Sequence, residues 1–78
     1  MDHDLPHMHP VTSSNIAAIG YALGERQLHV AFKNGGHYIY EGVDADTAAE
    51  AQRADSPGRF FASNIKGKFH GRKLEAAQ

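Results

Sequence analysis

The sequence predicts an α+β domain in which a three-stranded antiparallel β-meander is followed by two helices that pack on one face. Three observations predict this class. Apolar and polar residues alternate from Leu28 to Phe32, and β-forming residues resume at Tyr38-Ile39-Tyr40 after the turn-forming run Asn34-Gly35-Gly36. Beyond residue 44 the apolar residues recur at helical spacing instead.

The reversal at residues 34–36 decides which way two tyrosines face. Asn and Gly tolerate the positive φ angles that tight hairpin turns demand. If Asn34-Gly35 is a two-residue turn, Phe32 pairs with His37. Both Tyr38 and Tyr40 then lie on the face away from Phe32, as an exposed platform.

The other interpretation is a three-residue loop, Asn34-Gly35-Gly36, that contains a bulge. Phe32 then faces Tyr38 and Val30 faces Tyr40, so both rings join the core with their hydroxyls at its rim. We favour this loop because Gly36 suits a left-handed bulge position and because core area is scarce in so short a chain.

The first strand is predicted at about Ile16–Leu23. Ile19, Tyr21 and Leu23 occupy alternate positions and therefore share one strand face. The short polar run of residues 24–26 then turns the chain back into the hairpin.

The first helix is predicted at about Ala45–Ala54. Asp44 or Asp46 can cap it, and the acidic charge suits the first turn of a helix. Its candidate buried face consists of small residues that supply little apolar area, which makes it an accessory helix. These residues are Ala48, Ala51 and Ala54.

The second helix is predicted at about Pro57–Gly67, with Ser56 as N-cap and proline at the first helical position, where its missing N–H is not needed. Phe61 and Ile65 lie four residues apart and cover the sheet together with Phe60. Phe69 continues this series if the helix extends so far. This is the predicted core helix.

The 78 residues are enough for one domain. We predict a flexible N-terminal tail over residues 1–10, a domain over residues 11–73 and a frayed C-terminal tail over residues 74–78. The chain contains no cysteine and no apolar run near the roughly 20 residues that cross a bilayer, so we expect a soluble cytoplasmic protein without membrane contact. No cofactor is expected. The α-amine, two backbone amides and the His3 imidazole favour at most adventitious binding of Cu(II) or Ni(II).

Charge is divided between two adjacent segments. Residues 59–73 carry a formal charge of +5 and no acidic residue, whereas residues 44–55 sum to −3. A basic run with nearby tyrosines is typical of proteins that bind phosphates and stack on unpaired bases. The alternative is a solvated helix end in which the basic side chains complement the carbonyl dipole.

Enzyme motifs are missing from the sequence. It contains no phosphate-binding glycine loop and no nucleophile elbow, so we expect a protein without catalytic activity. His29 and His37 fall on predicted strands and are interpreted as surface or rim residues.

A set of short motifs spans about residues 11–73 in one order. They are Val11-Thr12-Ser13-Ser14, Ile16, Ile19-Gly20-Tyr21, Leu28-x-Val30-x-Phe32, Gly35, Tyr38-x-Tyr40, Val43, Ala54-x-Ser56-x-Gly58-x-Phe60 and Ile65-Lys66-x-x-Phe69. Together they resemble the KTSC domain, a short module named for the C-terminus of some lysyl-tRNA synthetases and also found alone in small bacterial and phage proteins. The attachment to a synthetase implies RNA binding as a hypothesis for the family.

The sequence thus favours a small non-catalytic binding module for RNA, either tRNA or single-stranded RNA. The expected contacts are basic residues on phosphates and a tyrosine ring on a base. These residues are Tyr38, Tyr40, Lys66, Lys68, Arg72 and Lys73. The alternative is a protein-interaction or regulatory module of bacterial or phage origin that docks through a sheet edge or through its oppositely charged segments.

Overall fold

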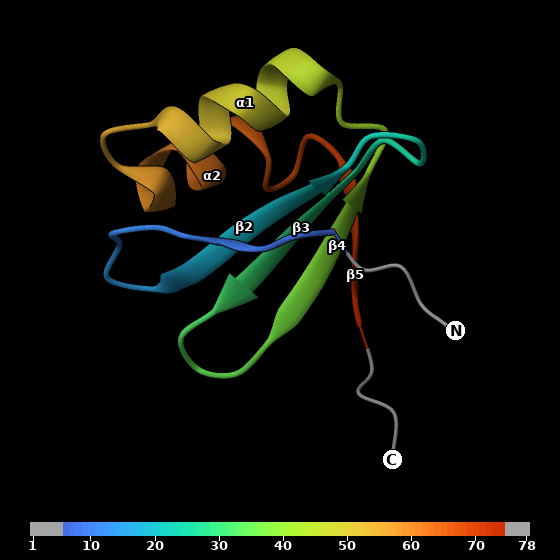
Figure 1. Cartoon of the computed structure of the whole chain (residues 1–78). Coiled ribbons are helices and arrows are strands. Elements are labelled where there is room, and N and C mark those ends of the chain that lie inside the picture. Colours follow the sequence, from blue (N-terminus) through green and yellow to red (C-terminus); the bar gives the residue numbers. More distant parts are fainter. Residues whose placement is uncertain (1–5, 75–78) are drawn as a thin grey trace.

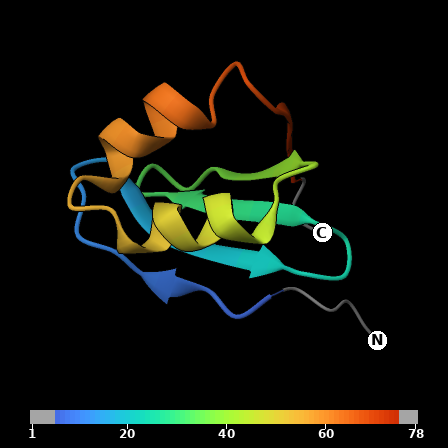
Figure 2. The same ribbon diagram turned by 90° about the horizontal axis from the view of Figure 1, so that it is seen from above.

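A five-stranded antiparallel sheet carries both helices on one face (Figures 1 and 2). The computed structural model describes residues 6–74. The strands follow one another across the sheet in chain order, and the helices come between the last two. The elements are β1 (His9–Pro10), β2 (Ile16–Ala22), β3 (Gln27–Phe32), β4 (His37–Glu41), α1 (Ala45–Arg53), α2 (Pro57–Asn64) and β5 (His70–Lys73).

The predicted α+β class and the two helices are confirmed, but the sheet has five strands instead of three. The prediction missed the two outer strands, β1 and β5. One has only two residues and includes a proline, and the other reads HGRK, so neither shows an apolar alternation. Both are edge strands, and each is held in the sheet by backbone hydrogen bonds to a single neighbouring strand.

Ordered structure extends into both predicted tails. His9 pairs with Ile19, so the sheet already begins before residue 11. At the other end the Leu74 backbone N–H donates to the His37 carbonyl at 2.7 Å. Residues 1–5, with the proposed metal ligand His3, and residues 75–78 lie outside the described residues.

The hairpin between β3 and β4 has a three-residue loop, but it is centred one residue earlier than predicted. The Gly35 N–H donates to the Phe32 carbonyl at 2.9 Å, and the Phe32 N–H donates to the Gly36 carbonyl at 2.7 Å. Gly35, with φ of 101°, takes the left-handed position that the sequence analysis assigns to Gly36.

This loop sets the register of the tyrosines. Val30 pairs with Tyr38 and Leu28 with Tyr40, so the predicted pairs of Phe32 with Tyr38 and of Val30 with Tyr40 are wrong by two residues. A shift of two preserves the face, because side chains alternate with period two. The prediction that both rings point toward the core is therefore confirmed.

An irregularity in β2 brings two isoleucines onto one face. Ile16 pairs with Phe32, whereas Ala18 pairs with Ala31, so an extra residue is inserted between them. Ile16 and Ile19 are both buried as a result, despite their odd spacing. Leu23, which the alternation places on the core face, instead starts the turn after β2 and is 67% exposed.

Both helices start where the sequence predicts. Asp44 occupies the N-cap position of α1, and its carboxylate accepts a hydrogen bond from the Thr47 hydroxyl at 2.6 Å. Ser56 caps α2 by accepting from the Arg59 backbone N–H at 3.4 Å. Helix α2 ends at Asn64, so it is shorter than predicted and does not include Phe69, which is half-buried in the connection to β5.

The core lies between the helices and one face of the sheet. Ile65 is fully buried and Phe61 is 8% exposed, which confirms α2 as the main core helix. From α1 the core receives only the predicted small side chains Ala48 and Ala51. The sheet contributes Ile16, Ile19, Leu28, Val30 and Tyr40, and the segment after β4 contributes Val43.

A pair of hydrogen-bonded histidines lies on the other face of the sheet. His29 Nδ1 and His37 Nε2 are 3.0 Å apart, and His29 is only 3% exposed, so its interpretation as a surface residue is wrong. One ring must accept the shared proton and therefore be neutral. Burial lowers the pKa of both imidazoles, and the nearby His37 and Arg72 lower the pKa of His29 further against an opposing effect of Glu25.

We expect mild acid to destabilise the fold. Histidines in the unfolded chain take up protons near their ordinary pKa of 6.5, whereas the folded pair binds protons only at lower pH. The contribution of this histidine pair to stability is therefore fully present above pH 6.5 and is lost as the pH falls below it. Thermal unfolding followed by circular dichroism should give a lower Tm at about pH 5.5 than at about pH 7.5.

A double variant tests the origin of this pH dependence. His29→Gln with His37→Gln removes both titrating rings, and the loss of Tm on acidification should become smaller. His70→Gln on the exposed strand β5 is the matched control and should leave the loss unchanged. An equal pH dependence in all three proteins would assign it to other groups.

Candidate aromatic pocket

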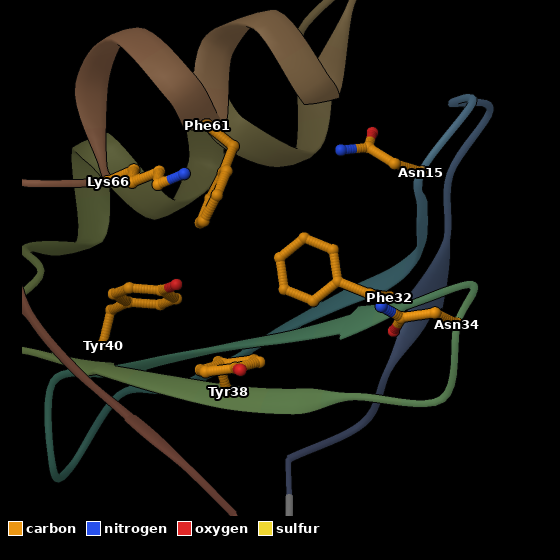
Figure 3. A pocket seen from close by; sticks show the side chains of 7 residues that line it. All are labelled: Asn15, Phe32, Asn34, Tyr38, Tyr40, Phe61 and Lys66. Carbon is orange, nitrogen blue, oxygen red and sulfur yellow. The ribbon is translucent and has the colours of Figure 1, made fainter.

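A pocket of about 340 Å³ opens between α2 and the end of the sheet where β3 turns into β4. Figure 3 shows its side chains pointing toward one another across a central hollow. The volume falls within the range of small-molecule sites. The lining residues are Asn15, Phe32, Asn34, Tyr38, Tyr40, Phe61 and Lys66.

Four rings form a closed circuit around this pocket. Phe32 meets Tyr38 edge to face at a centroid distance of 5.7 Å and Phe61 at 5.4 Å. Tyr40 meets Phe61 edge to face at 5.3 Å and lies at 25° to Tyr38, with centroids 6.5 Å apart. We call Phe32, Tyr38, Tyr40 and Phe61 the aromatic circuit. It presents ring faces and edges of the kind that flat aromatic ligands prefer.

The hairpin and α2 position the circuit. Tyr38 and Tyr40 are two apart on β4, so they share the face that the helices cover. Phe32 closes β3 just before the loop, and Phe61 reaches down from the middle of α2. The three-residue loop is decisive, because a two-residue turn would send both tyrosines to the opposite face.

Two amide side chains border the circuit and present donors to the pocket. Asn15 Oδ1 accepts a hydrogen bond from the Ser13 hydroxyl at 3.0 Å, and Asn34 Oδ1 accepts from the Gly36 backbone N–H at 2.9 Å. With both oxygens engaged, the Nδ2 groups are the ends left to meet a ligand. The pocket therefore favours ligands that carry hydrogen-bond acceptors.

Lys66 adds a positive charge at the α2 side of the pocket. It comes just after Ile65, the C-cap of α2, and its backbone N–H donates to the Phe61 carbonyl at 2.9 Å. Its amino group points toward Phe61 (Figure 3). Burial, with a smaller effect of Tyr38, raises the pKa of the Tyr40 hydroxyl, so this group stays neutral and remains able to donate a hydrogen bond.

The comparison with known families identifies the chain. The model of the KTSC domain matches residues 12–69, which include every residue that lines the aromatic pocket. This chain belongs to the KTSC domain family.

A solved structure and a sequence relative agree with this assignment. The crystal structure of a KTSC domain protein from Yersinia pestis is 41% identical and superposes with a TM-score of 0.86, covering 91% of this chain and 100% of that one. A protein of Tsukamurella paurometabola is 37% identical over 62 residues, which are 80% of this chain and 92% of the relative. The five-stranded architecture with two helices therefore has a close counterpart in a solved KTSC domain.

Of the side chains that the sequence predicts as nucleic-acid contacts, three meet in the aromatic pocket. They are Tyr38, Tyr40 and Lys66. Lys73 lies nearby, since it pairs with Tyr38 across β4 and β5 and cross-strand partners share a face.

The other two predicted contacts do not line this pocket. Lys68 is exposed in the connection between α2 and β5. Arg72 pairs with Ile39 on the face of the sheet opposite the helices, and its Nε donates to Glu41 at 2.8 Å. The basic segment is thus divided between the two faces of the sheet.

The sequence pattern did not mark Asn15, Asn34, Phe32 or Phe61 as site residues. Phe32 and Phe61 had the spacing of core residues, and Asn34 had the signature of a turn. The start of β2 and the end of β3 are neighbours in any antiparallel meander, so Asn15 and Asn34 were predictable as a pair. Within residues 6–74 no group of three or more acidic or histidine side chains offers a metal site, and no helix there is long and apolar enough to cross a membrane.

Proposed function

We propose that this KTSC domain is a non-catalytic module that binds unpaired RNA by taking one base into the aromatic pocket. The observation that carries the proposal is the closed circuit of four rings, bordered by amide and amine donors. Every base offers a face for stacking on aromatic side chains, and bases also carry carbonyl and ring-nitrogen acceptors. Each stacked base contributes about 1–3 kcal/mol to binding.

The charges around the pocket support an anionic ligand. Lys66 lines the pocket, and Lys73 lies beside Tyr38 on the same face of the sheet. Both can contact phosphates on either side of an inserted base. Lys68 adds long-range attraction, whereas Arg72 is engaged with Glu41 on the far face and contributes less.

We expect a two-dimensional NMR titration with single-stranded RNA at low salt to shift the amide signals of residues 38, 40 and 66. Lys66→Gln should weaken binding about tenfold. It should also reduce the slope of log affinity against log salt concentration by about one, as expected for the loss of one phosphate contact. Arg26→Gln is the matched control, since it removes one charge at the turn between β2 and β3, which lies at the other end of β3 from the pocket. That control should retain most of the affinity.

Other outcomes separate the alternatives. Single-stranded DNA of the same sequence tests for the 2′-hydroxyl, and tRNA tests for a structured target. If no RNA shifts the pocket signals, or if Arg26→Gln weakens binding as much as Lys66→Gln, the proposal is wrong. A dimer by light scattering without any response to RNA would favour a protein-interaction module instead.

A further inference from the structure

A second hollow lies beside the aromatic pocket. This neighbour has a volume of about 440 Å³ and is lined by Ser14, Asn15, Phe32, Lys33 and Asn34. Three of these residues also line the aromatic pocket, so they form the wall common to both hollows. We call Asn15, Phe32 and Asn34 the shared wall.

The backbone holds the shared wall in place. The Lys33 N–H donates to the Asn15 carbonyl at 2.8 Å, which joins the hairpin loop to the segment before β2. The hydroxyl of Ser13 accepts from the Ile16 backbone N–H at 3.2 Å while it holds Asn15 Oδ1. The two hollows are therefore fixed relative to each other before any ligand binds.

Each hollow has one lysine of its own, and the two hollows share two asparagines. Lys66 lines only the first hollow, and Lys33 lines only the second. Between them the amides of Asn15 and Asn34 present their Nδ2 groups, because both side-chain oxygens are engaged within the protein. A phosphate is a ligand with only acceptor oxygens, and amide and amine donors are common phosphate contacts.

We infer that the two hollows bind two successive nucleotides of one RNA strand, with the linking phosphodiester held by Asn15 and Asn34. This inference rests on the proposed function and deepens it. The first base packs against the aromatic circuit, and the second nucleotide lies over the Phe32 side of the wall, beside Ser14 and Lys33. Phe32, which lines both hollows, separates the two bases.

A length series tests the site size. The probes are the nucleoside uridine, which carries no phosphate, the dinucleoside monophosphate UpU and the trinucleotide UpUpU, each titrated by NMR against the full chain. Hydrogen bonds to a charged phosphate should make UpU bind about tenfold more tightly than uridine. A third nucleotide should add about threefold or less, as expected for a charge outside the two hollows.

A substitution that keeps the loop tests the amides. Asn34→Asp retains the oxygen that accepts from the Gly36 N–H but replaces the Nδ2 donor by a negative oxygen. It should abolish the advantage of UpU while leaving the affinity for uridine within about threefold. Gln52→Glu makes the same chemical change on α1, outside both hollows, and should preserve the advantage.

Lys33→Gln provides a second variant on an exposed side chain that no core contact needs. It should weaken the binding of UpU and not that of uridine. If UpU binds no more tightly than uridine, or if Asn34→Asp and Lys33→Gln both keep the full advantage, the two-nucleotide site is refuted while base binding in the first hollow stands. If neither uridine, UpU nor longer RNA shifts the pocket signals, both proposals fail together.

Discussion

Phe61→Ala should remove a large part of the stability of the domain. Truncating a buried phenylalanine costs about 3–5 kcal/mol, because the lost transfer free energy adds to that of the cavity left behind. Phe61 is 8% exposed and touches Phe32 and Tyr40 edge to face, so two further rings lose a partner. A chain of 78 residues has a free energy of unfolding of only about 4–12 kcal/mol. Urea unfolding followed by circular dichroism should therefore show a large fall of the midpoint.

The neighbouring residue supplies the control for this prediction. Phe60 belongs to the same helix but is only partly buried, against the outside of the core. Phe60→Ala makes the same chemical change, and we expect less than half the loss of stability. Equal losses for the two variants would contradict the assignment of Phe61 as the link between α2 and the sheet.

The parts of the fold that the sequence predicted are those where apolar periodicity and turn chemistry agree. The alternation around Val30 and the glycine-rich turn placed the central hairpin, and Ser56-Pro57 placed the start of α2. The end of α2 was less certain, because Phe61, Ile65 and Phe69 continue a helical spacing that the chain abandons. The backbone N–H groups of Ile65 and Lys66 both donate to the Phe61 carbonyl, and Gly67 then adopts a φ of 81°.

The edge strands were not predictable from the same signals. His70–Lys73 has four exposed residues and no apolar face, so hydrophobic pattern carries no information about it. Its pairing depends on backbone groups of β4 and on the shape of one ring, Tyr40. Such dependence on a tertiary contact leaves no local mark in the sequence.

The structure brings some of the predicted contact residues together and leaves others apart, and it adds side chains that the sequence did not mark. Tyr38, Tyr40 and Lys66 were chosen for their rings and charge, and they line one pocket. Arg72 was chosen for charge alone, and strand alternation sends it to the opposite face. Asn34 had a sufficient explanation as a turn residue, which concealed that its second amide atom remains available.

Gly71→Ala should weaken both the edge of the sheet and the aromatic pocket. Gly71 pairs with Tyr40 across β4 and β5, and a Cβ atom added there would overlap the Tyr40 ring, with Cδ1 only 2.7 Å away. An aromatic ring that covers a glycine on a neighbouring strand protects the backbone that the glycine leaves bare. Either Tyr40 must leave the circuit or β5 must move away, and overpacking of this kind costs about 1–3 kcal/mol.

Gly24→Ala is the matched control, since nothing lies within 4 Å of a Cβ atom at that turn position. We expect it to be neutral or to stabilise the protein by up to about 1 kcal/mol. Urea unfolding measures both variants, and the pocket signals in an NMR spectrum should move only for Gly71→Ala.

A double-variant cycle decides whether the ring itself causes the loss at Gly71. In a Tyr40→Leu background the planar ring is gone, so the alanine at position 71 meets a smaller and more adaptable side chain. Gly71→Ala should then lower the free energy of unfolding by less, with a coupling energy of about 0.5–3 kcal/mol between the two sites. If the two losses instead add within about 0.5 kcal/mol, the ring is not responsible. The strand β5 would then be held by its backbone pairing alone, and Tyr40 would be free to serve the pocket without it.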